Sequence, residues 1–169
     1  MLKQPKYLKT LKDISEDTQN NEWMTESSIQ AVDFDDVIID YTKPLHLVKK
    51  LRSVDALYDN ENELFFIEFK NGRLNKGKIY EVIQKIYDTI LVYGDITSKT
   101  LKDIKSKSIF ILVINGERNE KIKMVAPYKR KSSDSIFEEI NYFKNYCFKN
   151  IVVYTKEECE KFLGQYKKD

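Results

Sequence analysis

The chain has 169 residues, of which 33% are charged and 41% hydrophobic, with Lys+Arg 29 against Asp+Glu 27. That length is typical of one domain with a substantial core. The formal net charge of +2 excludes a strongly basic coat protein. One histidine and two cysteines exclude a histidine-rich metal centre, a zinc knuckle and a disulfide framework. We therefore expect Cys147 and Cys159 to be reduced, buried thiols.

The sequence has no feature that predicts membrane contact or export. No apolar run approaches the roughly 20 residues that span a bilayer. The segment 1–22 has no continuous apolar stretch of the kind found in secretory signals. These observations predict a cytoplasmic protein.

The N-terminal segment 1–25 is the least defined part of the sequence. Tyr7, Leu8, Leu11 and Ile14 share one helical face, and the polar stretch that follows predicts a loop. The Ser-x-x-Gln spacing that begins at Ser27 is similar to a capping box, and it predicts a helix around 27–38.

The middle of the chain has a clearer pattern. Two β-prone runs, Val54–Tyr58 and Leu64–Lys70, flank the turn-rich tetrapeptide 59–62, and they predict an antiparallel hairpin. Isoleucines at helical spacing then predict an amphipathic helix over Lys78–Tyr93. The continuous apolar run Ile109–Ile114 predicts a strand that is covered on both faces.

The last third of the sequence predicts two capped helices and short strands. An Asn-Gly pair indicates a turn into a further strand near Lys121–Val125. Capping boxes at Ser135 and Thr155 each open a helix, and Ile151–Tyr154 predicts a buried strand between them. The order of elements predicts a single α/β domain over 1–169, with a central mixed β-sheet flanked by helices.

Charged side chains gather at one end of the predicted hairpin. Side chains alternate between the faces of a strand, so Glu68 and Lys70 lie side by side on one face, and the hairpin brings Asp55 opposite them. Two converging carboxylates suit a hard cation such as Mg²⁺. Water and a substrate phosphate then complete its coordination shell. A neighbouring ammonium can position an attacking water, so these residues suit phosphodiester hydrolysis.

This pattern resembles the PD-(D/E)XK nuclease superfamily, which has a restriction-endonuclease-like core. Val54-Asp55 is similar to the first half-motif and Glu68-Phe69-Lys70 to the second, within a core of about 45–115. The resemblance implies that Asp55 and Glu68 ligate Mg²⁺, for which Mn²⁺ can substitute. It also implies that the Phe69 carbonyl can add a ligand and that Lys70 serves the nucleophilic water.

Two features of the resemblance lie outside the half-motifs. Gln84 and Tyr87 are similar to a Gln-x-x-x-Tyr motif of the exonuclease branch, one residue shorter, and by that likeness they support the catalytic site or the substrate. The superfamily often carries a glutamate on its first helix, for which Glu26 is the nearest candidate as an additional acid. The sequence departs from the family at Val54, which stands where the name-giving proline would be.

Basic residues crowd the exit of the second strand. Arg73, Lys76 and Lys78 are expected to contact nucleic-acid phosphates, and a second basic cluster lies within 121–131. The stretch 72–78 also matches the phosphate-binding loop G-x-x-x-x-G-K. Ile79, however, stands where that loop needs a serine or threonine, so a nucleotide triphosphatase is not favoured.

The sequence thus predicts a Mg²⁺-dependent nuclease, in the first place a deoxyribonuclease, which hydrolyses phosphodiester bonds in DNA in preference to RNA. The alternative is an inactive protein of the same fold that binds nucleic acid or protein as an accessory, immunity or regulatory module. The expected partner is nucleic acid, and no binding to a membrane is expected. The sequence leaves open whether the substrate is single- or double-stranded and whether cleavage is endo- or exonucleolytic. It also leaves open whether the chain assembles into a homodimer or a larger complex.

Overall fold

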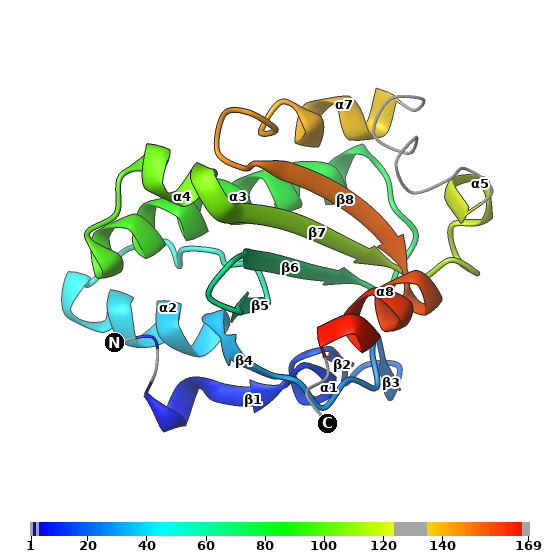
Figure 1. The fold of residues 1–169 in the computed structure, drawn as a ribbon, viewed down its shortest axis with the longest axis horizontal. Coiled ribbons are helices and arrows are strands. Elements are labelled where there is room, and N and C mark those ends of the chain that lie inside the picture. Colours follow the sequence, from blue (N-terminus) through cyan, green and yellow to red (C-terminus); the bar gives the residue numbers. More distant parts are fainter. Residues whose placement is uncertain (1, 3, 124–134, 167–169) are drawn as a thin grey trace.

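The chain folds into three layers, with a six-stranded β-sheet between two layers of helices (Figure 1). This is a computed structural model, and it describes residues 2, 4–123 and 135–166. The predicted α/β class, with a central mixed sheet flanked by helices, is confirmed. The sheet strands, in chain order, are β1 Leu8–Thr10, β4 Gln30–Asp33, β5 Ala56–Asp59, β6 Leu64–Lys70, β7 Ser108–Ile114 and β8 Asn150–Thr155.

The helices connect and cover these strands. The α-helices are α1 Leu11–Ile14, α2 Phe34–Thr42, α3 Lys76–Thr97, α4 Leu101–Lys107, α5 Glu120–Lys123, α7 Ser135–Asn141 and α8 Lys156–Leu163. Short 3-10 turns are η1 Pro5–Tyr7, η2 Lys43–Leu45 and η3 Gly164–Tyr166, and a separate small hairpin joins β2 Glu16–Asp17 to β3 Glu22–Trp23. The predicted capping box at the start of α8 is confirmed, because Thr155 and Glu158 exchange both hydrogen bonds. In the described part of the chain, no helix has the length and apolar composition needed to cross a membrane.

The sheet changes from antiparallel to parallel at β6. The spatial order is β1-β4-β5-β6-β7-β8, in which the pairs up to β6 are antiparallel and the two pairs after it are parallel. The predicted hairpin is confirmed, with Ala56 opposite Ile67 and Asp59 opposite Leu64. The parallel pairs need long crossovers, which α3 with α4 and then α7 supply.

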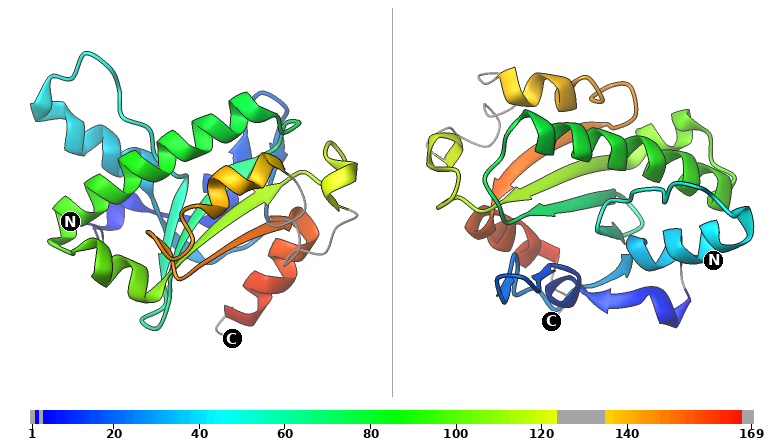
Figure 2. Two further views of the ribbon diagram at one scale, coloured as in Figure 1. Left: turned by 90° about the horizontal axis from the view of Figure 1, so that it is seen from above. Right: turned by 180° about the vertical axis from the view of Figure 1, so that it is seen from behind.

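The two faces of the sheet bury different sets of side chains. Leu64 and Phe66 of β6 pack with α2, α3, α4 and α7, whereas Phe65 and Ile67 pack with α1 and α8. The views in Figure 2 show α3 lying along one face of the sheet and α8 on the other. The predicted alternation of β6 is therefore confirmed, and it places Glu68 and Lys70 on the α3 face.

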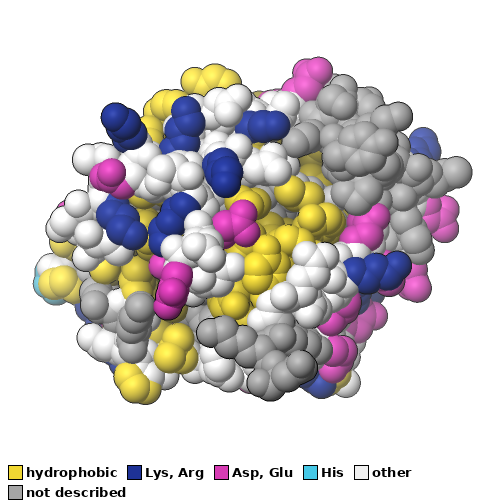
Figure 3. Space-filling view, viewed as in Figure 1, with side chains coloured by type: hydrophobic (Ala, Val, Ile, Leu, Met, Phe, Trp, Pro, Cys, Tyr) yellow, Lys and Arg dark blue, Asp and Glu magenta, His cyan; other side chains and the backbone are white. Residues whose placement is uncertain are grey.

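The opposite face, on the side of α8, is the one seen in the space-filling view. Figure 3 shows hydrophobic side chains in the centre of this face, basic side chains gathered toward α4 and the turn before β8, and acidic side chains toward α8. Cys159, on the inward side of α8, is fully buried, and Cys147 is buried on the α3 face. Both are free thiols, and burial raises the pKa of Cys147 to about 11 and that of Cys159 to about 12.

The N-terminal part differs from the sequence prediction. The expected helix over 27–38 is wrong in its first half, because 30–33 is strand β4 between β1 and β5. The helix α2 begins only at Phe34, after Asp33, whose side chain caps it by accepting the Asp35 and Asp36 N–H groups. Pairing with two distant strands thus outweighs the local capping signal at Ser27.

The strand expected near Lys121–Val125 is also wrong where the structure describes it. Residues 120–123 form the short helix α5. The rest of that prediction, and most of the second basic cluster, falls within 124–134, outside the described residues.

Candidate active site

Asp55 lies immediately before β5, and hydrogen bonds to α2, α3 and β6 hold Asp55 and its neighbour Val54 in place. The Val54 N–H donates to the buried Thr89 Oγ1 on α3 at 2.9 Å. The Asp55 carbonyl accepts the Phe34 N–H at 3.1 Å, and its Oδ2 accepts the Phe69 N–H at 2.6 Å. The last bond joins the first half-motif directly to the strand that carries the second.

Glu68 is the most deeply buried ionisable group at this end of β6. Its side chain is 0% exposed, and Lys70, two residues along the strand, is 17% exposed. Lys70 Nζ lies 2.7 Å from Glu68 Oε1. The structure therefore brings Asp55, Glu68 and Lys70 to one end of the hairpin, as the alternation of the strand predicts.

A second lysine, which the sequence analysis missed, lies between the two carboxylates. Lys85 reaches in from α3, and its Nζ is 2.8 Å from Asp55 Oδ1. The same Nζ lies 2.8 Å from Oε1 and 2.9 Å from Oε2 of Glu68. Lys85 thus contacts three carboxylate oxygens, and only 18% of its side chain is exposed. Two lysines and two carboxylates form a set without formal net charge.

The pattern of α3 contained a signal for Lys85. It is three residues after the buried Val82 and four before the buried Thr89, a spacing that places it on the inward helix face. A lysine on an apolar helix face can pack its aliphatic stem there and keep its ammonium in water, or it can bury the ammonium as a counter-ion. The sequence offers no means to choose between them.

Burial and charge act in opposite directions on this cluster. Burial raises the pKa of Glu68 to about 7 and repulsion from Asp55 adds to it, while Lys85 and Lys70 act to lower it. Burial lowers the pKa of Lys85, but attraction by Asp55 and Glu68 outweighs it and leaves that pKa above the ordinary 10.5. Lys85 is therefore an ammonium at neutral pH, whereas the ionisation of Glu68 is sensitive to its surroundings.

A further carboxylate lies beside the cluster. Asp35, in the first turn of α2, accepts a hydrogen bond from the Ser53 hydroxyl. It is exposed, and it interacts electrostatically with Asp55 and Lys85. Asp35 rather than Glu26 is the acid that a helix preceding the first half-motif brings toward the site.

Glu26 does not take the place that the resemblance assigns to it. It lies in the segment before β4, not on a helix, and its carboxylate pairs with Lys12 at 2.6 Å. Its N–H donates to Glu160 at 2.6 Å, which ties it to α8, on the other side of the sheet from α3. The helix predicted around 27–38 begins only at Phe34, so Glu26 lies eight residues before it.

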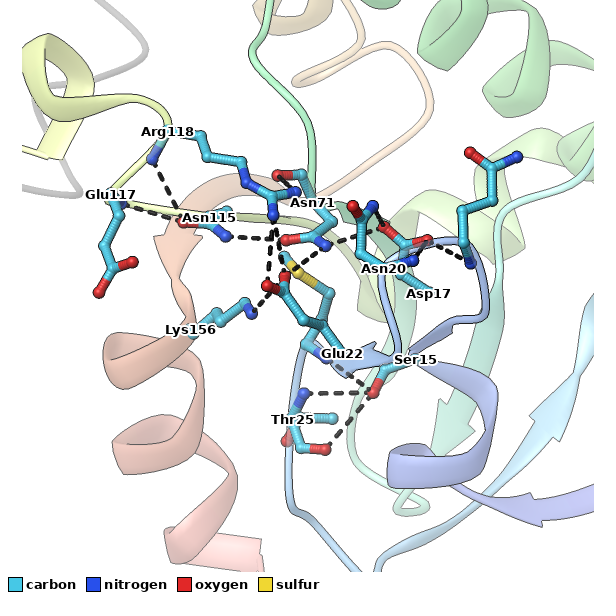
Figure 4. Close-up of polar contacts among 12 residues, drawn as sticks. Ser15, Asp17, Asn20, Glu22, Thr25, Asn71, Asn115, Glu117, Arg118 and Lys156 are labelled. Carbon is cyan, nitrogen blue, oxygen red and sulfur yellow. Dashed lines mark hydrogen bonds and ion pairs between the residues drawn. The ribbon is translucent and has the colours of Figure 1, made fainter.

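The end of β6 is anchored by a polar network centred on the buried Asn71 and Asn115 (Figure 4). Asn71, next to Lys70, donates to Asp17 at 2.8 Å and to Glu22 at 2.7 Å, both from the small β2–β3 hairpin. Asn71 Oδ1 accepts from Asn115 Nδ2 at 2.8 Å, and Arg118 pairs with Glu22 at 3.2 Å. The N-terminal hairpin therefore fixes the strand end that carries the candidate catalytic groups.

Gln84 and Tyr87 lie on the outer side of α3 and line a neighbouring pocket. This pocket has a volume of about 330 Å³, and its lining is Lys49, Lys50, Leu51, Arg52, Gln84, Tyr87 and Asp88. The Arg52 N–H donates to Asp88 at 2.9 Å, so this basic segment is held one helical turn from Lys85. Tyr87 packs edge-on against Phe143, and the structure gives neither Gln84 nor Tyr87 a contact with the carboxylate pair.

The three predicted nucleic-acid contacts lie where β6 leads into α3. Lys76 and Lys78 are exposed in the first turn of α3, and Lys78 pairs with Glu81 at 3.1 Å. Arg73 is exposed and lines a pocket of about 360 Å³ together with Arg118 and α5. The chain thus presents basic groups on both sides of the carboxylate pair.

The donor set fits a hard divalent cation. Asp55 and Glu68 converge on one cationic group, and Mg²⁺ is commonly bound by one or two carboxylates with water and a substrate phosphate. Glu68 Oε1 is buried, and its partners are the Lys70 and Lys85 ammonium groups, at 2.7 Å and 2.8 Å. In the same part of the chain, no group of three or more His, Cys, Asp or Glu residues could hold a metal. A metal here would therefore rest on two carboxylates.

Comparison with protein-family models, with curated proteins and with solved structures gives no match. The interpretation of the site consequently rests on its residues and their geometry.

Proposed function

We propose that this chain is a Mg²⁺-dependent nuclease of the PD-(D/E)XK type, which hydrolyses phosphodiester bonds in nucleic acid, DNA in preference to RNA. The observation that carries the proposal is the convergence of Asp55 and Glu68 on one cation position, with Lys70 2.7 Å from Glu68. Buried carboxylates that converge are costly unless a cation accompanies them. Buried carboxylates whose pKa is shifted also recur at catalytic sites.

The residues have separate roles in this proposal. Asp55, Glu68 and the Phe69 carbonyl would hold Mg²⁺ or Mn²⁺, which when bound acidifies water and offsets phosphate charge. Lys70, on the same face of β6, orients the attacking water and stabilises negative charge on the phosphate. The Phe69 N–H keeps Asp55 in place through its 2.6 Å bond.

Substrate binding would use the basic groups around the carboxylate pair. Arg73, Lys76 and Lys78 are exposed and basic, and they would contact phosphates, which gives affinity without sequence information. Gln84 and Tyr87, in the pocket beside Lys85, would support the substrate rather than the metal.

The test is cleavage of single-stranded DNA, double-stranded DNA and RNA with Mg²⁺, Mn²⁺ or EDTA. We expect metal-dependent cleavage that Lys70→Ala abolishes. Lys107→Ala is the matched control, because Lys107 pairs with Asp59 at the opposite end of the same hairpin, and it should cut at the wild-type rate. Cleavage by Lys70→Ala at the wild-type rate would show that the assignment is wrong.

A second candidate function is a non-catalytic module that binds nucleic acid or protein, as an accessory, immunity or regulatory protein. The observation that favours it is the pair of ammonium groups on Lys85 and Lys70, which already balances the charges of Asp55 and Glu68. This candidate predicts no cleavage of any of the three substrates and no increase in thermal stability on addition of Mg²⁺ or Mn²⁺.

A further inference from the structure

Lys85 occupies the position that a bound metal would need. Its Nζ lies 2.8 Å from Asp55 Oδ1 and 2.8 Å and 2.9 Å from the two Glu68 oxygens. Oxygen ligands of Mg²⁺ lie at about 2.0–2.1 Å and those of Ca²⁺ at about 2.3–2.6 Å. An ion bound to the same oxygens would therefore nearly coincide with the ammonium, and two cations at such a separation repel strongly.

We propose that the Lys85 ammonium is a built-in counter-ion that competes with a divalent cation for Asp55 and Glu68, so that the metal binds only when Lys85 withdraws. This deepens the proposed function, since it concerns the same two carboxylates, and it assigns to Lys85 the control of metal affinity.

The surroundings of Lys85 offer it a second location. Glu81 lies four residues before it and Asp88 three residues after it on α3, so both are within reach of a lysine on the same helix surface. Glu81 and Asp88 are both partly exposed. Because the lysine stem is long and flexible, the ammonium can move from the buried pair toward these outer carboxylates without a change in the helix.

Lys70 does not share this role. It contacts Glu68 Oε1, and the structure gives it no contact with Asp55. A cation between the two carboxylates leaves Lys70 beside Glu68, on the strand and facing the site. The two lysines therefore have different roles: Lys85 competes with the metal for the carboxylates, and Lys70 orients the attacking water.

The test compares Mn²⁺ affinity, measured by isothermal titration calorimetry, in wild type, Lys85→Gln and Lys107→Gln. Lys107 is the matched control, because it pairs with Asp59 at the far end of the hairpin, away from the carboxylate pair and from Glu81 and Asp88. We expect Lys85→Gln to bind Mn²⁺ at least about tenfold more tightly than wild type. Lys107→Gln should stay within about twofold of wild type, since a distant surface ion pair contributes little. Equal affinities of Lys85→Gln and wild type would overturn the proposal.

A second measurement uses the wild-type protein and does not depend on the folding of a variant. Acylation of individual lysines is followed by mass spectrometry with and without Ca²⁺. Ca²⁺ should increase the reactivity of Lys85 several-fold, because a displaced ammonium becomes accessible, while Lys107 at the far end of the hairpin should not change. Reactivity of Lys85 that no concentration of Ca²⁺ increases would count against displacement.

These outcomes are separable from those of the proposed function. Tighter Mn²⁺ binding by Lys85→Gln, without cleavage by any form of the protein, would support the role of Lys85 and reject the nuclease. Lys70-dependent cleavage, with equal Mn²⁺ affinities in wild type and Lys85→Gln, would support the nuclease and reject the role of Lys85.

Discussion

The burial of Glu68 leads to a quantitative prediction for the substitution Glu68→Gln. Burial raises the pKa of this carboxyl from its ordinary 4.5 to about 7 in the folded protein. Between these values the folded chain keeps a proton that the unfolded chain has released. The stabilisation from that proton is fully present below pH 4.5 and is lost as the pH rises through 7. Each pH unit corresponds to about 1.4 kcal/mol, so the full effect is roughly 3 kcal/mol.

The assay is urea unfolding of wild type and Glu68→Gln at pH 5 and pH 8 in the presence of EDTA. Both proteins share every other titrating group, so the difference between their free energies of unfolding isolates Glu68. From pH 5 to pH 8, we expect the free energy of unfolding of Glu68→Gln to rise by about 2–3 kcal/mol relative to that of wild type. Most of the range between the two pKa values of Glu68 lies within this pH interval. A difference that does not change with pH would refute the reasoning. It would mean that Lys85 and Lys70 compensate fully for the burial of this carboxylate.

Three further outcomes are expected. Thr89→Val leaves the buried Val54 N–H without its acceptor, so it should lower the free energy of unfolding by about 1–3 kcal/mol and speed exchange of that amide proton; an unchanged exchange rate would contradict the role of Thr89. Removing Arg73 and Lys76 together should weaken DNA binding and flatten its dependence on salt, measured by fluorescence anisotropy, and unchanged binding would exclude this loop from the interface. The Cys159 thiol, buried and with a pKa near 12, should react with a thiol reagent only as fast as the protein unfolds.

The central hairpin and its charged residues were predictable because their signals are local. Period-two alternation over 64–70 determines the face of each side chain, and a four-residue turn places Asp55 opposite Glu68. Helix α3 was predicted from the spacing of its apolar residues, although it extends beyond the predicted ends, over Lys76–Thr97.

The rest was not predictable because it depends on contacts between distant parts of the chain. The strand β4 exists because β1 and β5 lie on either side of it, and nothing in its four residues distinguishes it from the first turn of a helix. Lys85 is similar: its role depends on Asp55, thirty residues earlier. Local sequence patterns predict on which face of a helix or strand a side chain lies, but not which charged group it contacts there.

The helix α8 has a consequence for the order in which this protein can fold. It covers Phe65 and Ile67 from the far end of the sequence, and its Glu160 accepts hydrogen bonds from Thr25 and from the Glu26 N–H. A ribosome adds about 5–20 residues per second, so several seconds separate the synthesis of β6 from that of α8. During that time this apolar face of the growing sheet lacks the part of its cover that α8 provides. We therefore expect this face to complete folding only after α8 has left the ribosome, and to be a binding site for chaperones until then.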